Sequence, residues 1–136
     1  MRLVAVTLFL LACANSAAAK ECSRVDEQKA EAIAARLSDW NQIYDAFERF
    51  RHCDDGAIAE GFTDSIVRLL ASHWGSLPQA AALGQRDPVF RRFLVAHVNA
   101  SADPNDLSRL AGLAERNCPE QHRALCAEIH AAAIRQ

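Results

Sequence analysis

The chain has 136 residues, of which 51% are hydrophobic and 24% are charged, and its formal net charge is −2. This length suits one small domain and excludes a multidomain enzyme. The apolar content is too high for a disordered chain, and the nearly balanced charge gives no support for bulk electrostatic binding to nucleic acid.

The first nineteen residues have the pattern of a secretory signal peptide. Arg2 precedes an apolar run over residues 3–14, and the alanines at 17–19 offer a small-residue cleavage site. The run is shorter than the roughly 20 residues that a membrane-spanning helix needs. We therefore expect residues 1–19 to be removed from a periplasmic or secreted protein of 117 residues with a net charge of −3. The alternative is a lipid anchor on Cys13, because residues 10–12 resemble the box before a lipoprotein cysteine.

Residues 20–136 contain helix punctuation and no alternating strand pattern. Ser23 and Asp26 have the spacing of a capping box and predict the start of a first helix. Ser38 and Asp39 can cap a second helix. The sequence therefore predicts a single all-α domain over residues 20–136, a compact bundle of six to seven short helices.

The middle of the chain predicts two further helices. The acidic pair at 54–55 and Gly56 form a turn and cap before a third helix, which we expect to end near Trp74 and Gly75. Pro78 then suits the first position of a short fourth helix that stops at Gly84.

The last three helices are predicted from dipeptides that end in proline. Asp-Pro at 87–88 and at 103–104 combines a capping carboxylate with a residue suited to the first helical position. Cys-Pro at 118–119 repeats the pattern with a weaker cap and predicts a helix that begins at Pro119. The residues expected to be buried are Val25, Ala30, Ile33, Ala34, Leu37, Trp40, Ile43, Tyr44, Phe47, Phe50, Ile58, Phe62, Ile66, Leu69, Leu70, Val89, Phe90, Phe93, Leu94, His97, Leu107, Leu110, Ala111, Ala114, Leu125, Cys126, Ile129 and Ala133.

Four cysteines remain after the expected cleavage, and an oxidising compartment favours two disulfides. On a helix that begins at Pro119, Cys118 and Cys126 would be roughly 12 Å apart, beyond the roughly 7 Å that a disulfide spans. That separation excludes a Cys118–Cys126 disulfide. It also excludes Cys22–Cys53, because two disulfides would then require Cys118 to pair with Cys126. Two crossed pairings stay open: Cys22–Cys126 with Cys53–Cys118, favoured because Cys53 and Cys118 both lie in turns, or Cys22–Cys118 with Cys53–Cys126.

Histidines supply two candidate chemical sites. His122, Cys126 and His130 share one helical face, as ligands of a metal would, but a cysteine in a disulfide cannot be a thiolate ligand. We therefore expect no metal and no cofactor. His52 adjoins Cys53 and the acidic pair at 54–55, a grouping that could serve acid–base or nucleophilic chemistry, although an aspartate before a helix is an ordinary cap.

The two other histidines, His73 and His97, are expected to be packing residues. The chain also lacks the Gly-x-Ser-x-Gly and His-Glu-x-x-His motifs and a glycine-rich phosphate loop. The leading hypothesis is therefore that the protein is not an enzyme.

Charge is unevenly distributed along the chain. Residues 20–85 carry a net −4, whereas residues 86–136 carry +1. One interpretation of the acidic excess in residues 20–85 is that these carboxylates cap helices or face solvent. The other is that they form a docking surface for a basic partner. The predicted partner-binding residues are Asp54, Asp55, Glu60 and Asp64. On the other side, the arginines at 86, 91 and 92 could contact an anionic partner.

The sequence carries no motif specific to a protein family. Its leading interpretation is an exported, small helical protein-interaction module, an inhibitor or immunity-type protein that binds a partner protein through its acidic surface, without nucleic acid. The alternative is a small-ligand or metal-binding periplasmic carrier that uses His122, His130 and His97. A small enzyme with a site around His52 and Asp55 is a third hypothesis.

Overall fold

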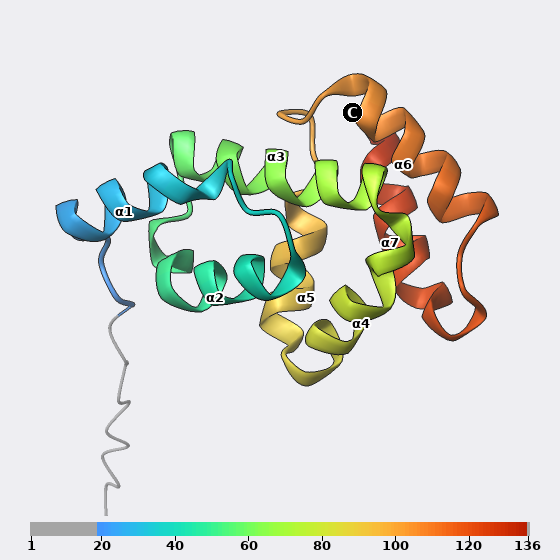
Figure 1. The fold of residues 1–136 in the computed structure, drawn as a ribbon, viewed down its shortest axis with the longest axis horizontal. Helices are drawn as coiled ribbons and strands as arrows, with labels where there is room; N and C mark the ends of the chain where they lie inside the picture. The colour runs from blue at the N-terminus through green and yellow to red at the C-terminus, as the bar shows by residue number, and fades with distance from the viewer. Residues whose placement is uncertain (1–18, 136) are drawn as a thin grey trace, which may run out of the picture.

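The computed structural model describes residues 19–135, so the predicted signal peptide and Cys13 lie outside the described residues, apart from Ala19. Within that part every secondary-structure element is a helix and there is no strand (Figure 1). The seven α-helices are α1 Arg24–Ala34, α2 Trp40–Phe50, α3 Gly56–Ser72, α4 Leu77–Arg86, α5 Pro88–Ala96, α6 Pro104–Arg116 and α7 Arg123–Ile134. Three short 3₁₀ turns lie between them, at Arg51–Cys53, Trp74–Ser76 and Glu120–His122. The all-α prediction is confirmed.

Most of the predicted helix starts are confirmed because their caps are local. The Ser23 hydroxyl accepts a hydrogen bond from the Asp26 amide at 3.1 Å, and Asp39 accepts one from the Gln42 amide at 2.9 Å. The side chain of Asp87 caps α5 and that of Asp103 caps α6, each accepting from two amides of the first turn. Each aspartate lies directly before a proline at the first helical position.

The fourth helix is longer than predicted and begins one residue earlier, at Leu77. Gly84 does not end it but lies buried within it, where an added Cβ would be 3.1 Å from the Cβ of Arg91. The glycine therefore permits α4 and α5 to approach closely. The sequence pattern instead predicts that Gly84 ends the helix.

Helix α3 is the longest and connects the two ends of the molecule (Figure 1). It packs against α1 near one end of the fold and against α6 near the other. The C-terminal pair α6 and α7 lie side by side, α4 packs on α5, and α5 reaches α7. The N-terminal unit α1–α3 and the C-terminal pair are thus held together through α3, α4 and α5.

The core joins these helices through an aromatic cluster. The Phe47 ring centroid lies 5.3 Å from that of Phe90 and 4.9 Å from that of Phe93. Phe62 of α3 meets Phe93 edge-on at 5.1 Å. Trp40 is also buried, and its indole N–H donates to the Ser76 hydroxyl at 2.8 Å, so its polar atom is satisfied.

Both disulfides differ from the predicted pairings. The bonds are Cys22–Cys53, with a Cα separation of 4.8 Å, and Cys118–Cys126, with a Cα separation of 6.1 Å. The two crossed pairings, Cys22–Cys126 with Cys53–Cys118 and Cys22–Cys118 with Cys53–Cys126, are therefore wrong. The premise that failed is the start of the last helix, because α7 begins at Arg123 and Pro119 is extended. The chain turns back through Glu120–His122 and brings the two cysteines together.

Three residues expected to be buried lie at the surface. Val25 and Val89 lie in the first turns of their helices and face away from the core, since Phe90, next to Val89, is fully buried. His73 is exposed because α3 ends at Ser72 and leaves it in the following turn. His97, by contrast, is only 4% exposed, as predicted. None of the helices in residues 19–135 qualifies as a membrane-spanning segment by its length and hydropathy.

Candidate functional site

A hollow of about 510 Å³ lies beside the Cys22–Cys53 disulfide. It forms because α1 and α3 run parallel, so that both helices begin at the same end of the fold (Figure 1). The disulfide joins the segments that precede these two helices. Four carboxylates line the depression, which we call the acidic hollow: Glu27, Glu31, Asp54 and Asp55.

Three of these carboxylates form no ion pair within the part of the chain that the structure describes. No Lys, Arg or His side chain of residues 19–135 forms an ion pair with Glu27, Glu31 or Asp55. Arg51 also lines the hollow, with its guanidinium carbon over the Phe47 ring, 5.0 Å from the centroid, and its charge leaves the four carboxylates in excess. The hollow therefore concentrates negative charge on a concave surface, where fields are strongest.

The four predicted partner-binding residues do not all meet there. Asp54 and Asp55 line the hollow, and Asp55 also caps α3 by accepting from the Gly56 amide at 2.8 Å. Glu60 is exposed one turn further along α3 and forms no ion pair with any described side chain. Asp64 lies beyond it and pairs with Arg68, which also donates to backbone carbonyls after α1.

Sequence reasoning missed Glu27 and Glu31. Their spacing of four residues places them on one face of α1. Their place beside Asp54 and Asp55 depends on the packing of α1 along α3 and on the Cys22–Cys53 bond. The predicted crossed disulfides would have drawn Cys22 towards the last helix, so the error in pairing concealed these two residues.

Behind Asp54 lies a buried chain of hydrogen bonds. The His97 Nε2 is 3.2 Å from Asp54 Oδ2, and its Nδ1 is 3.0 Å from the Thr63 hydroxyl. An ionised carboxylate only accepts, so Nε2–H donates to Asp54, and in the neutral ring Nδ1 accepts from Thr63. Asn99 Nδ2 donates to the Thr63 oxygen at 3.2 Å. These hydrogen bonds fix the Asp54 carboxylate of the hollow to α3 and to the end of α5.

The order hydroxyl, imidazole, carboxylate in this chain is also the order used in nucleophilic catalysis. Thr63, however, is only 1% exposed, and its oxygen already accepts a hydrogen bond from Asn99. A substrate could not reach that oxygen without displacing the packing around it. In this structure the three groups act together to position Asp54.

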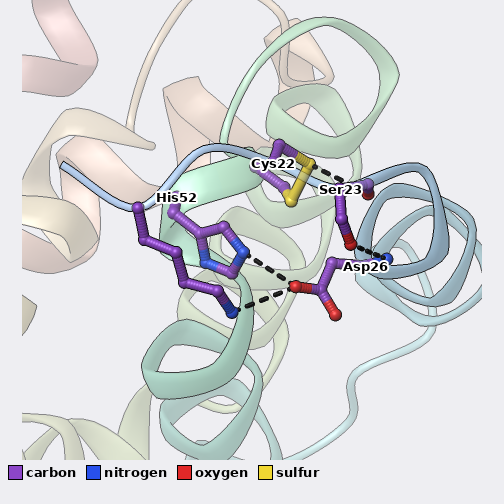
Figure 2. Close-up of a disulfide and its surroundings, with 6 residues drawn as sticks. Cys22, Ser23, Asp26 and His52 are labelled. Carbon is purple, nitrogen blue, oxygen red and sulfur yellow. Dashed lines mark hydrogen bonds and ion pairs between the residues drawn. A yellow bond between two sulfur atoms is a disulfide. The ribbon is translucent and has the colours of Figure 1, made fainter. Parts of the chain in front are cut away.

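His52 engages a different carboxylate from the one that sequence reasoning suggested. Figure 2 shows its ring directed at Asp26, next to the disulfide of Cys22, and Nε2 is 3.0 Å from Asp26 Oδ2. Lys20 Nζ reaches the same oxygen at 3.0 Å. The hydrogen bond from Lys20, and then that from His52, holds the pKa of the Asp26 carboxyl below its usual value.

We expect Asp26 to make stability fall in acid. Because its folded-state pKa is depressed, its contribution is complete above its unfolded pKa, about 3.8, and is lost as pH falls through the lower folded value. Titration of the Asp26 carboxyl by NMR should give a pKa below about 3.8, and Lys20→Gln should move it upward. Asp26→Asn should flatten the acid limb of unfolding free energy against pH. An unshifted pKa in the native chain would contradict this assignment.

The structure does not bring His122, Cys126 and His130 together as ligands. Cys126 is in a disulfide, and His122 lies in a 3₁₀ turn before α7 rather than on its face. Among residues 19–135 no three His, Cys, Asp or Glu side chains are grouped so that they could hold a metal ion.

A scan against protein-family models and searches of curated proteins and of solved structures returned no match to this chain.

Proposed function

We propose that this chain is an exported protein-interaction module, of the inhibitor or immunity type, that binds the basic surface of one partner protein through the acidic hollow. The observation that supports this function best is the set of three unpaired carboxylates, Glu27, Glu31 and Asp55, on one concave surface. Glu60 extends the negative surface along α3.

Export is supported by two features of the chain. The first nineteen residues have the pattern of a signal peptide. The two disulfides suit an oxidising compartment, such as the bacterial periplasm or the medium outside the cell.

The geometry favours a partner that presents lysine or arginine side chains. Such a side chain could enter the hollow and pair with Glu27 and Glu31, while the surrounding carboxylates steer the encounter. The disulfide and the Asp54–His97 hydrogen bond hold the hollow in shape before binding. Little ordering entropy would then be lost on association.

Charge reversal tests this function. The disulfide-bonded chain would be immobilised and used to capture proteins from the exported fraction of the source cells. We expect one basic partner at near-equal stoichiometry, and at least tenfold weaker binding by Glu27→Lys/Glu31→Lys, because attraction becomes repulsion. Binding should also weaken as salt is raised.

The matched control makes the same change in net charge at the other end of the molecule. Glu115→Lys/Glu120→Lys replaces two exposed glutamates near α6 and α7, and should bind as the native chain does. Equal loss in both variants, or no captured partner with the native chain, would refute the proposed function.

A further inference from the structure

A second concave site, which shares no lining residue with the acidic hollow, lies between α5 and α7. It is a groove of about 670 Å³ whose apolar lining includes Val95, Ala96, Val98 and Ala132. This volume is in the range of roughly 300–1,000 Å³ that is common for small-molecule sites. Val95 and Ala96 present the accessible part of this apolar lining, whereas Val98 and Ala132 are buried beneath it.

Most polar groups of this groove are already satisfied within the protein. Arg91 donates to both carboxylate oxygens of Glu128, at 3.1 and 3.0 Å. The amide nitrogen of Asn99 donates to Thr63 and to the Ala96 carbonyl, and its oxygen accepts from the Ser101 amide and hydroxyl. A polar ligand would find few free partners along this lining.

Two arginines are the exception. Arg92 and Arg135 line the groove, are exposed, and form no ion pair or side-chain hydrogen bond with any described residue. With Arg91 and Glu128, they give the groove a net charge of +2, although the chain as a whole carries −2. The site therefore combines an apolar surface with two guanidinium groups available to an anion, and guanidinium matches carboxylate geometry well.

We propose that this groove binds a free long-chain carboxylate, a fatty acid, with its acyl chain along Val95 and Ala96 and its head group at Arg92 and Arg135. An acyl chain needs no hydrogen bonds, which suits a lining whose other polar groups are occupied. The concave form suits a single chain better than the flat surface of a bilayer.

The test is binding of dodecanoate, below its micelle concentration, to the disulfide-bonded chain, followed by calorimetry or by displacement of a fluorescent anionic probe. We expect saturable binding of one dodecanoate per chain. Dodecanol, which has the same length but no charge, should bind about tenfold more weakly, and Arg92→Ala/Arg135→Ala should weaken dodecanoate about tenfold and leave dodecanol unchanged.

Two matched comparisons separate the site from general charge effects. Arg36→Ala/Arg109→Ala removes two exposed, unpaired arginines elsewhere and should not alter binding. Ala96→Glu, one turn after Arg92, should abolish the preference for dodecanoate, whereas Ala96→Gln should retain it. Equal affinity for dodecanoate and dodecanol, an unchanged arginine double variant, or binding only to vesicles of anionic phospholipid would overturn the proposal.

Discussion

Removal of the Cys22–Cys53 disulfide should lower the free energy of unfolding by about 3.7 kcal/mol in the chain-entropy account, because the bond closes a loop across 31 positions. The matched loss for Cys118–Cys126, which spans 8 positions, should be about 2.5 kcal/mol. The variants are Cys22→Ser/Cys53→Ala and Cys118→Ser/Cys126→Ala, since Cys53 and Cys126 are buried and the other two cysteines are more exposed.

Urea unfolding of the three proteins measures this difference. Peptide mapping without reduction comes first, and should recover Cys22 linked to Cys53 and Cys118 linked to Cys126. A larger loss from the Cys118–Cys126 variant than from the Cys22–Cys53 variant would contradict the loop-entropy argument, and a cross-linked fragment that joins Cys22 to Cys118 or Cys126 would contradict the fold itself.

Gly61→Ala should destabilise the protein by about 2 kcal/mol, although alanine is the better helix former by about 1 kcal/mol. Gly61 lies within α3 where α1 ends against it, and an added Cβ would lie 2.8 Å from the Ala34 Cβ and 2.9 Å from the Ala35 nitrogen. These atoms cannot retreat easily, because Ser65 donates to the Ala34 carbonyl at 2.6 Å beside them. The methyl group must therefore push α1 away from α3.

Gly112→Ala is the matched control for this substitution. Gly112 is also buried within a helix, α6, but a Cβ there would meet only the guanidinium end of Arg116, a flexible and exposed side chain that can move. The control should therefore stabilise the protein by roughly 0.5–1 kcal/mol, through helix propensity. Thermal or urea unfolding compares the two, and stabilisation by Gly61→Ala would show that α1 can move aside without cost.

The sequence predicted those features of the fold that depend on neighbouring residues. Asp87 and Asp103 determine where α5 and α6 begin because a carboxylate oxygen reaches the amides of the first turn. Cys118 has no such oxygen, so Cys-Pro did not start a helix and Pro119 is extended. Because the last helix therefore begins later than predicted, Cys118 can pair with Cys126, and both predicted disulfide pairings are wrong.

The candidate site was only partly predictable for a related reason. Asp54 and Asp55 stand out locally as an acidic turn, and both line the hollow. Glu27 and Glu31 join them through the packing of α1 on α3. The partnership of Asp54 with His97 spans 43 residues. Contacts of this range follow from how the helices pack, which periodicity alone does not determine.

The positions of the disulfides also define how this protein would respond if it were stretched between its two ends. Tension would pass directly from Cys22 to Cys53 and from Cys118 to Cys126, so residues 23–52 and 119–125 would remain slack loops. The acidic hollow lies beside one of these disulfides, Cys22–Cys53. The segment between Cys53 and Cys118, with α5 inside it, would carry the load, together with the part of α7 that follows Cys126.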